Sequence, residues 1–299
     1  MKKITILLAT YNGERYLEEQ LESLILQKNV IFKILVRDDG STDGTLDILR
    51  RWEKNGQLTW YSGTHTGVQM GYYELMKKAG EYESDFFAFC DQDDRWDPDK
   101  LETAVKELSQ FPDTMPALYY SGQRLTDENL VFISDHRLNE KRDRKSRYVI
   151  TDIAGCTAMF NRSLLYKVLE YEPKYMLMHD SWLYRVCISI GGNVKIDSRP
   201  HMDYRQHGKN TFGMGVGIVG KIIHGMHYLT KLSMEKEIRE VSKGYYSQMT
   251  PEYKALTDEV CGYKKHFRFK RRLLNSRYIN FYNRGLNFTY KVKVLLNKL

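Results

Sequence analysis

The stretch FFAFCDQDDRWDPDKL, residues 86–101, changes abruptly from apolar to acidic within this 299-residue chain. Five apolar residues of strand type lead into Asp91, Asp93 and Asp94, and Pro98 then marks the start of a helix. Open α/β sheets bind their ligands at the carboxyl ends of their strands. Carboxylates crowded at that edge repel one another, and a divalent cation relieves the repulsion. The stretch therefore predicts a buried strand that ends in a site for a cation and a phosphate group.

The residues around this stretch alternate between strand and helix patterns. Strands are predicted at 4–9, 31–37, 58–62 and 86–90, and helices at 13–27, 43–54, 67–80 and 98–110. A further strand is predicted at 156–161, with helices at 162–171 and 179–190. Such alternation predicts an α/β fold, a mostly parallel sheet with helices on both faces. The charge run at 137–147 is predicted to be an exposed loop.

The composition is that of a folded protein, with 42% hydrophobic and 28% charged residues. Four scattered cysteines form no CxxC pair, which argues against a disulfide framework or a zinc site and favours a reducing cytosol. The short apolar run at 4–9 is interpreted as a first strand and not as a signal peptide. The longest apolar candidate, 213–232, contains lysines and histidines, so we expect no transmembrane helix and a cytoplasmic protein.

Positive charge is concentrated in the last third of the chain. Residues 216–299 contain 17 lysines and arginines against 6 aspartates and glutamates, whereas residues 1–215 contain 29 against 32. We therefore predict an α/β domain over 1–215 and a basic, mostly helical region over 216–299. Basic and aromatic residues are interleaved in 264–282, a pattern typical of segments that bind an anionic membrane surface. The alternatives are a segment that binds nucleic acid and a helix that packs on the first domain with its basic face in solvent.

Two further motifs follow the first and second predicted strands. They are ATYNGE at 9–14 and RDDGSTDGT at 37–45, where glycines permit tight turns and Asp38 or Asp39 can bind a base or a ribose. A calcium loop is excluded because its twelfth position requires a bidentate glutamate and is Arg50 here. The chain has no GxGxxG or GxxxxGK[ST] motif after these strands, which weakens dinucleotide and P-loop interpretations. Taken alone, the second motif is equally well explained as a simple turn.

Together, the motifs ATYN, RDDGSTDGT and CDQDD resemble those of family 2 glycosyltransferases with the GT-A (Rossmann-like) fold, over about residues 3–212. The resemblance implies an inverting enzyme that uses a nucleotide-diphosphate sugar and Mg²⁺ or Mn²⁺. It also assigns roles to individual residues. The donor nucleotide would contact Ala9, Tyr11, Asn12, Asp39 and Asp91, the metal would bind Asp93, and Asp94 is left open between a metal ligand and a helix cap.

Three downstream motifs extend the resemblance. The first, MHDSWLYR at 178–185, places Asp180 where the family has its catalytic base, although an acidic residue there also caps a helix. The second, YRQHGKN at 204–210, resembles bacterial rhamnosyltransferase-type members and offers His207 to the metal or the diphosphate. The third, AGCTAMFNR at 154–162, matches the family's Gly-x-Thr strand near the acceptor, although ordinary core packing explains it as well. The expected acceptor or diphosphate side comprises Gly155, Thr157, His179, Trp182 and Arg205.

The sequence thus predicts a metal-dependent transferase that builds a bacterial surface polysaccharide at the inner face of the cell membrane. From the resemblance, the expected donor is dTDP-rhamnose, and the expected acceptor is lipid-linked or a growing polysaccharide. Another UDP- or dTDP-sugar, such as UDP-glucose or UDP-galactose, is one alternative. A non-catalytic protein that binds nucleotides or nucleic acid is the other. For the transferase we expect no nucleic-acid partner, and a homo-oligomer is left open.

Overall fold

The computed structural model describes residues 2–208 and 233–299 and builds them around one nine-stranded sheet. The strands are β1 (Lys3–Thr10), β2 (Ile31–Asp38), β3 (Thr59–Ser62), β4 (Phe86–Cys90), β5 (Arg95–Trp96), β6 (Ala117–Thr126), β7 (Phe132–His136), β8 (Met159–Asn161) and β9 (Asn193–Arg205). Their order across the sheet is β3-β2-β1-β4-β8-β6-β9-β5, and β7 pairs with β6.

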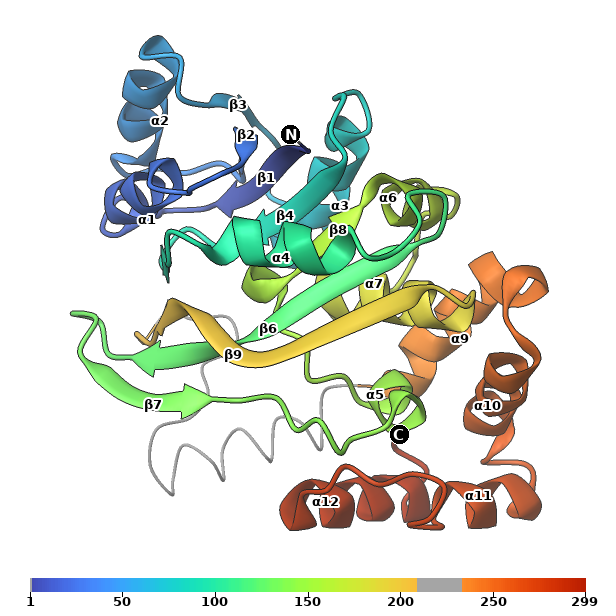
Figure 1. Ribbon diagram of the computed structural model, residues 1–299. Helices are drawn as coiled ribbons and strands as arrows, with labels where there is room; N and C mark the ends of the chain where they lie inside the picture. The colour runs from blue at the N-terminus through green and yellow to red at the C-terminus, as the bar shows by residue number, and fades with distance from the viewer. Residues whose placement is uncertain (1, 209–232) are drawn as a thin grey trace.

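Eleven α-helices are described, and those that precede β9 cover the sheet. They are α1 (Leu17–Ile25), α2 (Thr45–Lys54), α3 (Gly67–Ala79), α4 (Lys100–Leu108), α5 (Arg144–Val149), α6 (Arg162–Leu169), α7 (His179–Ser189), α9 (Met234–Tyr245), α10 (Pro251–Gly262), α11 (Phe267–Leu273) and α12 (Arg284–Leu295). Figure 1 shows α9–α12 gathered at one end of the molecule, beside α7 and α5.

The four strands predicted before residue 100 form the parallel half of the sheet, since β1 pairs in parallel with β2 and β4, and β2 with β3. All five residues of β4 are buried, because helices pack on both faces. On β1, Ile6 and Leu8 belong to one core with residues of α1, α2 and α4. The intervening Leu7 belongs to the other core, with residues of α3, α6 and α7. This alternation confirms the predicted α/β layering.

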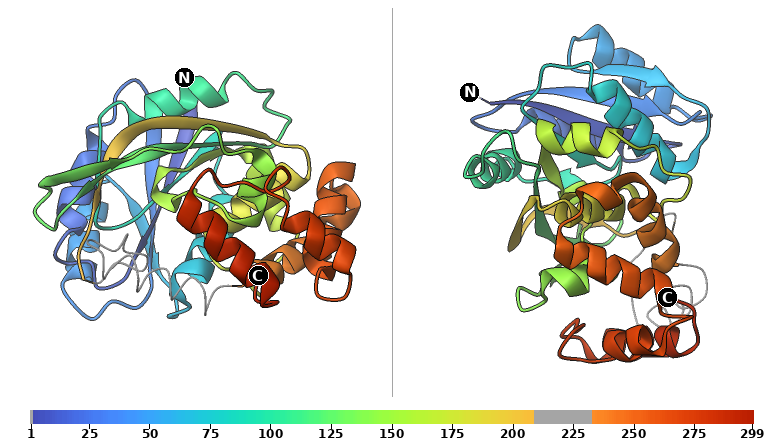
Figure 2. Two further views of the ribbon diagram at one scale, coloured as in Figure 1. Left: turned by 90° about the horizontal axis from the view of Figure 1, so that it is seen from below. Right: turned by 90° about the vertical axis from the view of Figure 1, so that its right-hand side faces the viewer.

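The second half of the sheet is mixed and curled. The short strand β8 is antiparallel to both β4 and β6, while β9 runs parallel to β6 over most of its thirteen residues. The register between β6 and β9 shifts at Gly122, where a Cβ atom would lie 2.7 Å from the backbone oxygen of Ser198. The views in Figure 2 show the bend of these long strands. The bend returns the end of β9 to the carboxyl end of β4, and this brings the 204–208 segment to the motif at 91–94.

The C-terminal helices share a core with the sheet. Ile238 and Val241 of α9 are buried in the same apolar cluster as Trp182 and Leu183 of α7. The ring of Tyr245 lies 6.1 Å from that of Trp182. The predicted boundary at residue 215 lies outside the described residues, as does the apolar candidate at 213–232. Across the described ranges, we find no helix with both the length and the apolar character needed to span a bilayer.

The prediction of an exposed loop at 137–147 is correct for most of 137–143, which lie outside any helix or strand and are mostly exposed, but not for the whole run. The run leads into α5, and the side chains of Arg142 and Arg147 are only 4% and 2% exposed. Both guanidinium groups are paired with the carboxylate of Asp152, and Arg147 also donates to backbone oxygens of the same segment. Paired arginines can be buried in this way, and a count of charges along the chain does not reveal the pairing.

Candidate active site

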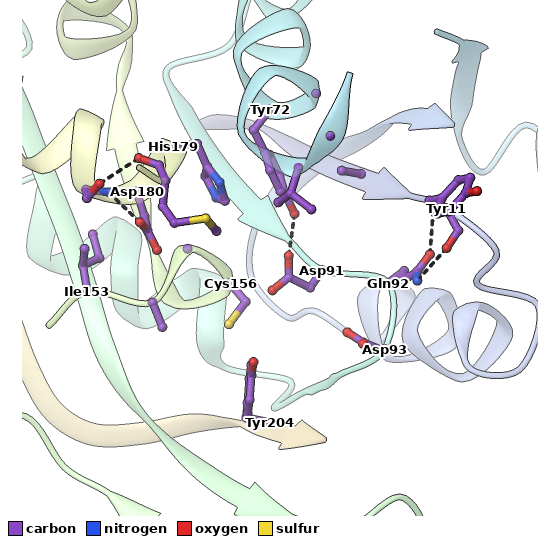
Figure 3. A pocket seen from close by; sticks show the side chains of 18 of the residues that line it. Tyr11, Tyr72, Asp91, Gln92, Asp93, Ile153, Cys156, His179, Asp180 and Tyr204 are labelled. Carbon is purple, nitrogen blue, oxygen red and sulfur yellow. Dashed lines mark hydrogen bonds between the residues drawn. The ribbon is translucent and has the colours of Figure 1, made fainter. Parts of the chain in front are cut away.

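A cavity of about 940 Å³ opens at the carboxyl ends of β1, β2 and β4. Ten of the thirteen predicted site residues line it: Ala9, Tyr11, Asn12, Asp39, Asp91, Asp93, Gly155, His179, Asp180 and His207. Figure 3 shows Tyr11 at one side of this cavity, Asp91 near its centre and Asp180 at the opposite side. Parallel strands end at one edge of the sheet, which explains why motifs far apart in sequence meet here.

Gln92 fastens the end of β4 to the end of β1. Its Oε1 accepts hydrogen bonds from the Thr10 hydroxyl (2.6 Å) and the Tyr11 backbone N–H (2.9 Å). Its Nε2 donates to the Tyr11 backbone oxygen at 3.2 Å. The phenol ring of Tyr11 stays 44% exposed at the cavity mouth, with its centre 4.6 Å from the ring of His65. The sequence analysis assigned no role to either residue. Gln92 is a neutral residue between two aspartates, and His65 lies in a short polar segment that matches none of the motifs.

Asp39 and Asn12 lie where the first two motifs meet. The Asp39 carboxylate pairs with Arg37 and accepts from the backbone N–H groups of Thr66 (3.3 Å) and Gly67 (3.2 Å). The Asn12 Oδ1 accepts from the backbone N–H of Thr42 at 2.8 Å. The Asn12 contact joins the loops after β1 and β2, and the Asp39 contacts join the end of β2 to the start of α3.

Asp91 directly follows β4 at the cavity floor. The hydroxyl of Tyr72, on α3, donates to its Oδ1 at 2.7 Å. Burial, followed by the charge of Asp93, raises the pKa of Asp91 to about 6. Both causes favour a positive ligand, since each opposes a bare negative charge at this position.

Asp93 points to the segment that returns along β9. Its Oδ2 lies 2.7 Å from the Nε2 of His207, whose ring stacks on that of Tyr16. The guanidinium of Arg205 donates to the Asp93 backbone oxygen at 2.8 Å and so holds this turn in place. A carboxylate oxygen and an imidazole nitrogen at this separation can serve together as ligands of one divalent cation.

Asp94 is fully buried and is not a helix cap, because the N-cap of α4 is Asp99. Its Oδ1 accepts from the backbone N–H of Arg205 at 3.2 Å. Its Oδ2 has no hydrogen-bond partner within residues 2–208 and 233–299. Burial first, and then the charges of Asp93 and Asp91, raise the pKa of Asp94 well above its usual range. An unpaired buried carboxylate oxygen costs free energy, so a ligand is the natural explanation for it.

Asp180 lies in the first turn of α7 on the far wall of the cavity, where its carboxylate accepts from the backbone N–H of Ser181 at 2.5 Å. Burial raises the pKa of Asp180 to about 7, although the backbone N–H groups of Ser181 and Gly155 oppose the rise. A carboxylate whose pKa lies near neutrality, in a cavity, is suited to accept a proton.

His179 forms the inner wall beside Asp180. Its ring stacks on that of Tyr72 with centres 3.8 Å apart and meets Phe89 edge-on at 4.7 Å. Burial lowers the pKa of His179 to about 3, so the ring is neutral. A Cβ atom at position 155 would lie 2.4 Å from the His179 Nε2, so the contact requires Gly155.

Three predicted residues do not line the cavity. The Thr157 hydroxyl donates to the backbone oxygen of Ala154 at 2.8 Å. Trp182 is fully buried in the apolar core. Arg205 lies behind the cavity, where it contacts the Asp93 backbone and the carboxylate of Glu19.

Glu237, on α9, fixes the start of α7 from behind. Its buried carboxylate pairs with Arg185 and accepts from the Ser181 hydroxyl at 2.9 Å and 3.0 Å. It also accepts from the backbone N–H of Leu177 at 2.9 Å. The sequence analysis missed this role, because nothing in the local sequence of Glu237 shows that α9 packs on α7. The C-terminal region therefore helps to position the helix that carries Asp180.

The comparisons with known proteins agree with this geometry. The model of the family "Glycosyl transferase family 2" matches residues 5–169, more than half of the chain. The chain is a family 2 glycosyltransferase. The predicted family is thereby confirmed.

Relatives of this glycosyltransferase include RfbG of Shigella flexneri, described as a dTDP-rhamnosyl transferase. RfbG is 30% identical over 236 residues, which cover 72% of this chain and 76% of RfbG. The putative teichuronic acid biosynthesis glycosyltransferase TuaG of Bacillus subtilis is 29% identical over 124 residues, which are 41% of this chain and 47% of TuaG.

Two solved structures show the same fold. A structure of S. aureus TarS with UDP-GlcNAc has a TM-score of 0.58 at 16% identity, covering 98% of this chain and 90% of that one. The mannosyltransferase PcManGT of Pyrobaculum calidifontis, solved with GDP-Man and Mn²⁺, has a TM-score of 0.53 at 16% identity, covering 99% and 87%. At these identities the likeness supports the GT-A fold alone, and the predicted fold class is confirmed.

Proposed function

We propose that this glycosyltransferase is an inverting, metal-dependent enzyme that transfers rhamnose from dTDP-rhamnose to a surface-polysaccharide acceptor. The observation that carries the proposal is the shared cavity, which Tyr11, Asp39, Asp91 and Asp93 line together with Asp180. The first four residues have the chemistry to bind a nucleotide diphosphate. Asp180 has the chemistry to deprotonate an acceptor.

The nucleotide would bind at the Tyr11 side of the cavity. The exposed Tyr11 ring offers a face for the base, and Asp39 offers an acceptor for a pyrimidine ring N–H. Asp91 would accept from the ribose, and Asn12 and Ala9 shape the wall. The choice of rhamnose over another UDP- or dTDP-sugar rests on the relative RfbG, a dTDP-rhamnosyl transferase.

A divalent cation, Mg²⁺ or Mn²⁺, would be held by Asp93 with His207 and, when bound, would neutralise the charge of the leaving diphosphate. The residues present fit such an ion, since the Asp93 and His207 ligand atoms lie 2.7 Å apart at the cavity wall. The structural neighbour PcManGT was solved with Mn²⁺.

Asp180 would remove the proton from the acceptor hydroxyl as the new glycosidic bond forms on the face opposite the leaving diphosphate. That arrangement inverts the anomeric configuration. Gly155 and His179 lie beside Asp180, and we assign this end of the cavity to the acceptor. Because Asp180 sits in the first turn of α7, the helix fixes its direction, and Glu237 in turn fixes the helix.

The C-terminal region would bind an anionic membrane and so bring the site to a lipid-linked acceptor. Phe267 on α11 and Phe288 on α12 are 79% and 71% exposed, which is unusual for phenylalanine. Arg268 and Arg271 are exposed on α11. Exposed aromatic and basic side chains on short helices suit the headgroup region of a bilayer. We therefore place the protein at the inner face of the cell membrane.

The experiment is a donor screen by thermal shift in the presence of Mn²⁺, followed by a transfer assay with the donors that bind. We expect dTDP- or UDP-sugars to raise the melting temperature and dTDP-rhamnose to be turned over. A non-catalytic nucleotide-binding protein would show the shift without turnover. Tighter binding of a guanosine donor would refute the pyrimidine assignment.

A further inference from the structure

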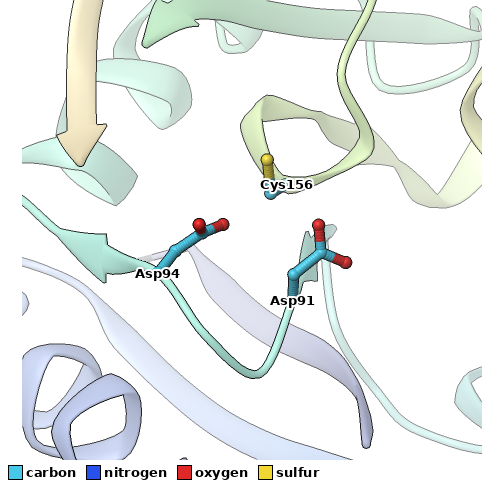
Figure 4. Close-up of side chains that lie close together, drawn as sticks. All are labelled: Asp91, Asp94 and Cys156. Carbon is cyan, nitrogen blue, oxygen red and sulfur yellow. The ribbon is translucent and has the colours of Figure 1, made fainter. Parts of the chain in front are cut away.

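Cys156 lies opposite the acidic motif, in the short turn between the loop at 150–154 and β8. One ligand atom from each of Asp91, Asp94 and Cys156 lies within 4.8 Å of the other two. Figure 4 shows both carboxylates directed towards the space beside the Cys156 sulfur. Asp91 and Cys156 line the cavity, so an ion can reach this cluster from solvent.

The spacing of the cluster suits a small ion. Bonds to Zn²⁺ are about 2.0–2.3 Å long to oxygen and sulfur, which places ligands about 3.5 Å apart around a tetrahedral ion. Modest rotations of side chains already within 4.8 Å close this set. Gln123 supplies a further oxygen nearby, since its Oε1 lies 3.9 Å from the Cys156 sulfur.

Asp94 supplies a second, independent observation. Its side chain is fully buried, yet its Oδ2 is unpaired in the described part of the protein, and its carboxylate is directed into the cluster. Folding has therefore buried a carboxyl group there with one of its two oxygens unpaired.

We infer that Asp91, Asp94 and Cys156 form a binding site for a thiophilic divalent cation such as Zn²⁺ or Cd²⁺, separate from the Asp93–His207 pair. A sulfur ligand selects such ions, whereas Mg²⁺ requires about six oxygen ligands in octahedral geometry. The cation itself displaces the thiol proton to solvent, as bound metals do with coordinating thiols. The site therefore discriminates against the ion proposed for catalysis.

A consequence for activity rests on the proposed function. Asp91 would be shared between this site and the ribose, so a cation held by Asp94 and Cys156 withdraws it from the nucleotide. Zn²⁺ should then inhibit transfer in competition with the nucleotide sugar at constant Mn²⁺. The binding of the cation itself does not depend on the identity of the donor.

The test is a titration of the purified, nucleotide-free protein with Cd²⁺, followed by the ultraviolet charge-transfer absorption of the cadmium–thiolate bond. We expect a band that saturates at one Cd²⁺ per chain. Cys156→Ser should lose it. Cys261→Ser is the matched control, because Cys261 is a free thiol on α10, outside the cluster, and this variant should keep the band.

Two further variants keep the thiol in place and so do not depend on the folding of Cys156→Ser. Asp94→Asn should weaken Cd²⁺ binding at least about tenfold, as losses around metal sites do. Asp93→Asn should weaken Cd²⁺ binding less than Asp94→Asn does, since a nearby charge is lost but no ligand. The inference is overturned if the wild type gives no band, if Cys156→Ser retains it, or if Asp94→Asn binds as tightly as wild type. If the cadmium band is present but the transfer assay shows no activity, the proposed function is contradicted and the inferred metal site is not.

Discussion

Replacing Asp180 by asparagine should make the protein less active and more stable at the same time. Asparagine has the same shape and can accept the Ser181 N–H, but it cannot take a proton. A positioned general base contributes about 10²–10⁴-fold to the rate, and transfer should fall by that factor. Nucleotide-sugar affinity should change little, because Asp180 lies at the side of the cavity away from Tyr11.

The stability gain follows from the pKa of Asp180, which folding raises from 3.8 to about 7. The protonated carboxyl is favoured in the folded state, so its contribution is fully present below pH 3.8 and is lost as the pH rises to about 7. Above pH 7 the buried charge costs up to about 4 kcal/mol, at about 1.4 kcal/mol for each tenfold change in proton affinity. Asparagine carries no such cost.

Urea unfolding of the two proteins at pH 8 and near pH 4 measures this difference. We expect Asp180→Asn to be the more stable protein at pH 8 and the two to converge near pH 4. Asp113→Asn is the control, since the Asp113 side chain is 70% exposed and its ion pair with Lys2 lies at the surface, so activity should be unchanged and stability should change by less than about 1 kcal/mol. A variant that retains more than about a tenth of kcat, a barrier difference below about 1.4 kcal/mol, would show that Asp180 is not the base. A variant less stable than wild type at pH 8 would refute the pKa argument.

Three other outcomes follow from the same geometry. Because Asp180 must be ionised to act, kcat/KM should fall about tenfold per pH unit below pH 7, and a flat profile from pH 5 to 8 would contradict this. A chelator should abolish transfer, and Asp93→Asn should lose most activity without unfolding; undiminished turnover in chelator would contradict the metal proposal. Charge reversal at Arg268 and Arg271 should reduce co-sedimentation with anionic liposomes in a salt-dependent way, at about 1 kcal/mol per charge. Within the part of the chain that the structure describes, neither arginine forms an ion pair, whereas Arg272 pairs with Glu259 at 2.8 Å. A variant that sediments as wild type would exclude α11.

The sequence was sufficient to predict the parallel half of the fold, because each strand there is followed by its own helix and the pattern is local. It also indicated the acidic turn after β4, since clustered carboxylates at a strand end are visible in one short window. In the mixed half, the segments that became β8, α6 and α7 were predicted but the strand pairings were not. These pairings join β6 to β9 and β8 to β4, and such contacts leave no signal in a single segment.

Within the site as well, residues in local motifs were predicted, whereas contacts between distant segments were not. Asp91, Asp93 and Asp180 were found from motifs, whereas the meeting of Cys156 with Asp94 depends on where the chain returns. Gln92 and Glu237 act through hydrogen bonds to segments far away in the chain. Trp182 is adjacent in sequence to site residues but belongs to the core, because successive residues of α7 point in different directions.

The most direct test of the proposed reaction is the release of dTDP from dTDP-rhamnose by the purified protein, with Mn²⁺ and a membrane extract as the source of acceptor. We expect wild type to release dTDP while the extract gains rhamnose in the inverted configuration. Asp180→Asn should release almost none while binding the donor normally. Neither release nor transfer from any dTDP- or UDP-sugar, despite donor binding, would contradict the proposed reaction and favour a non-catalytic nucleotide-binding protein.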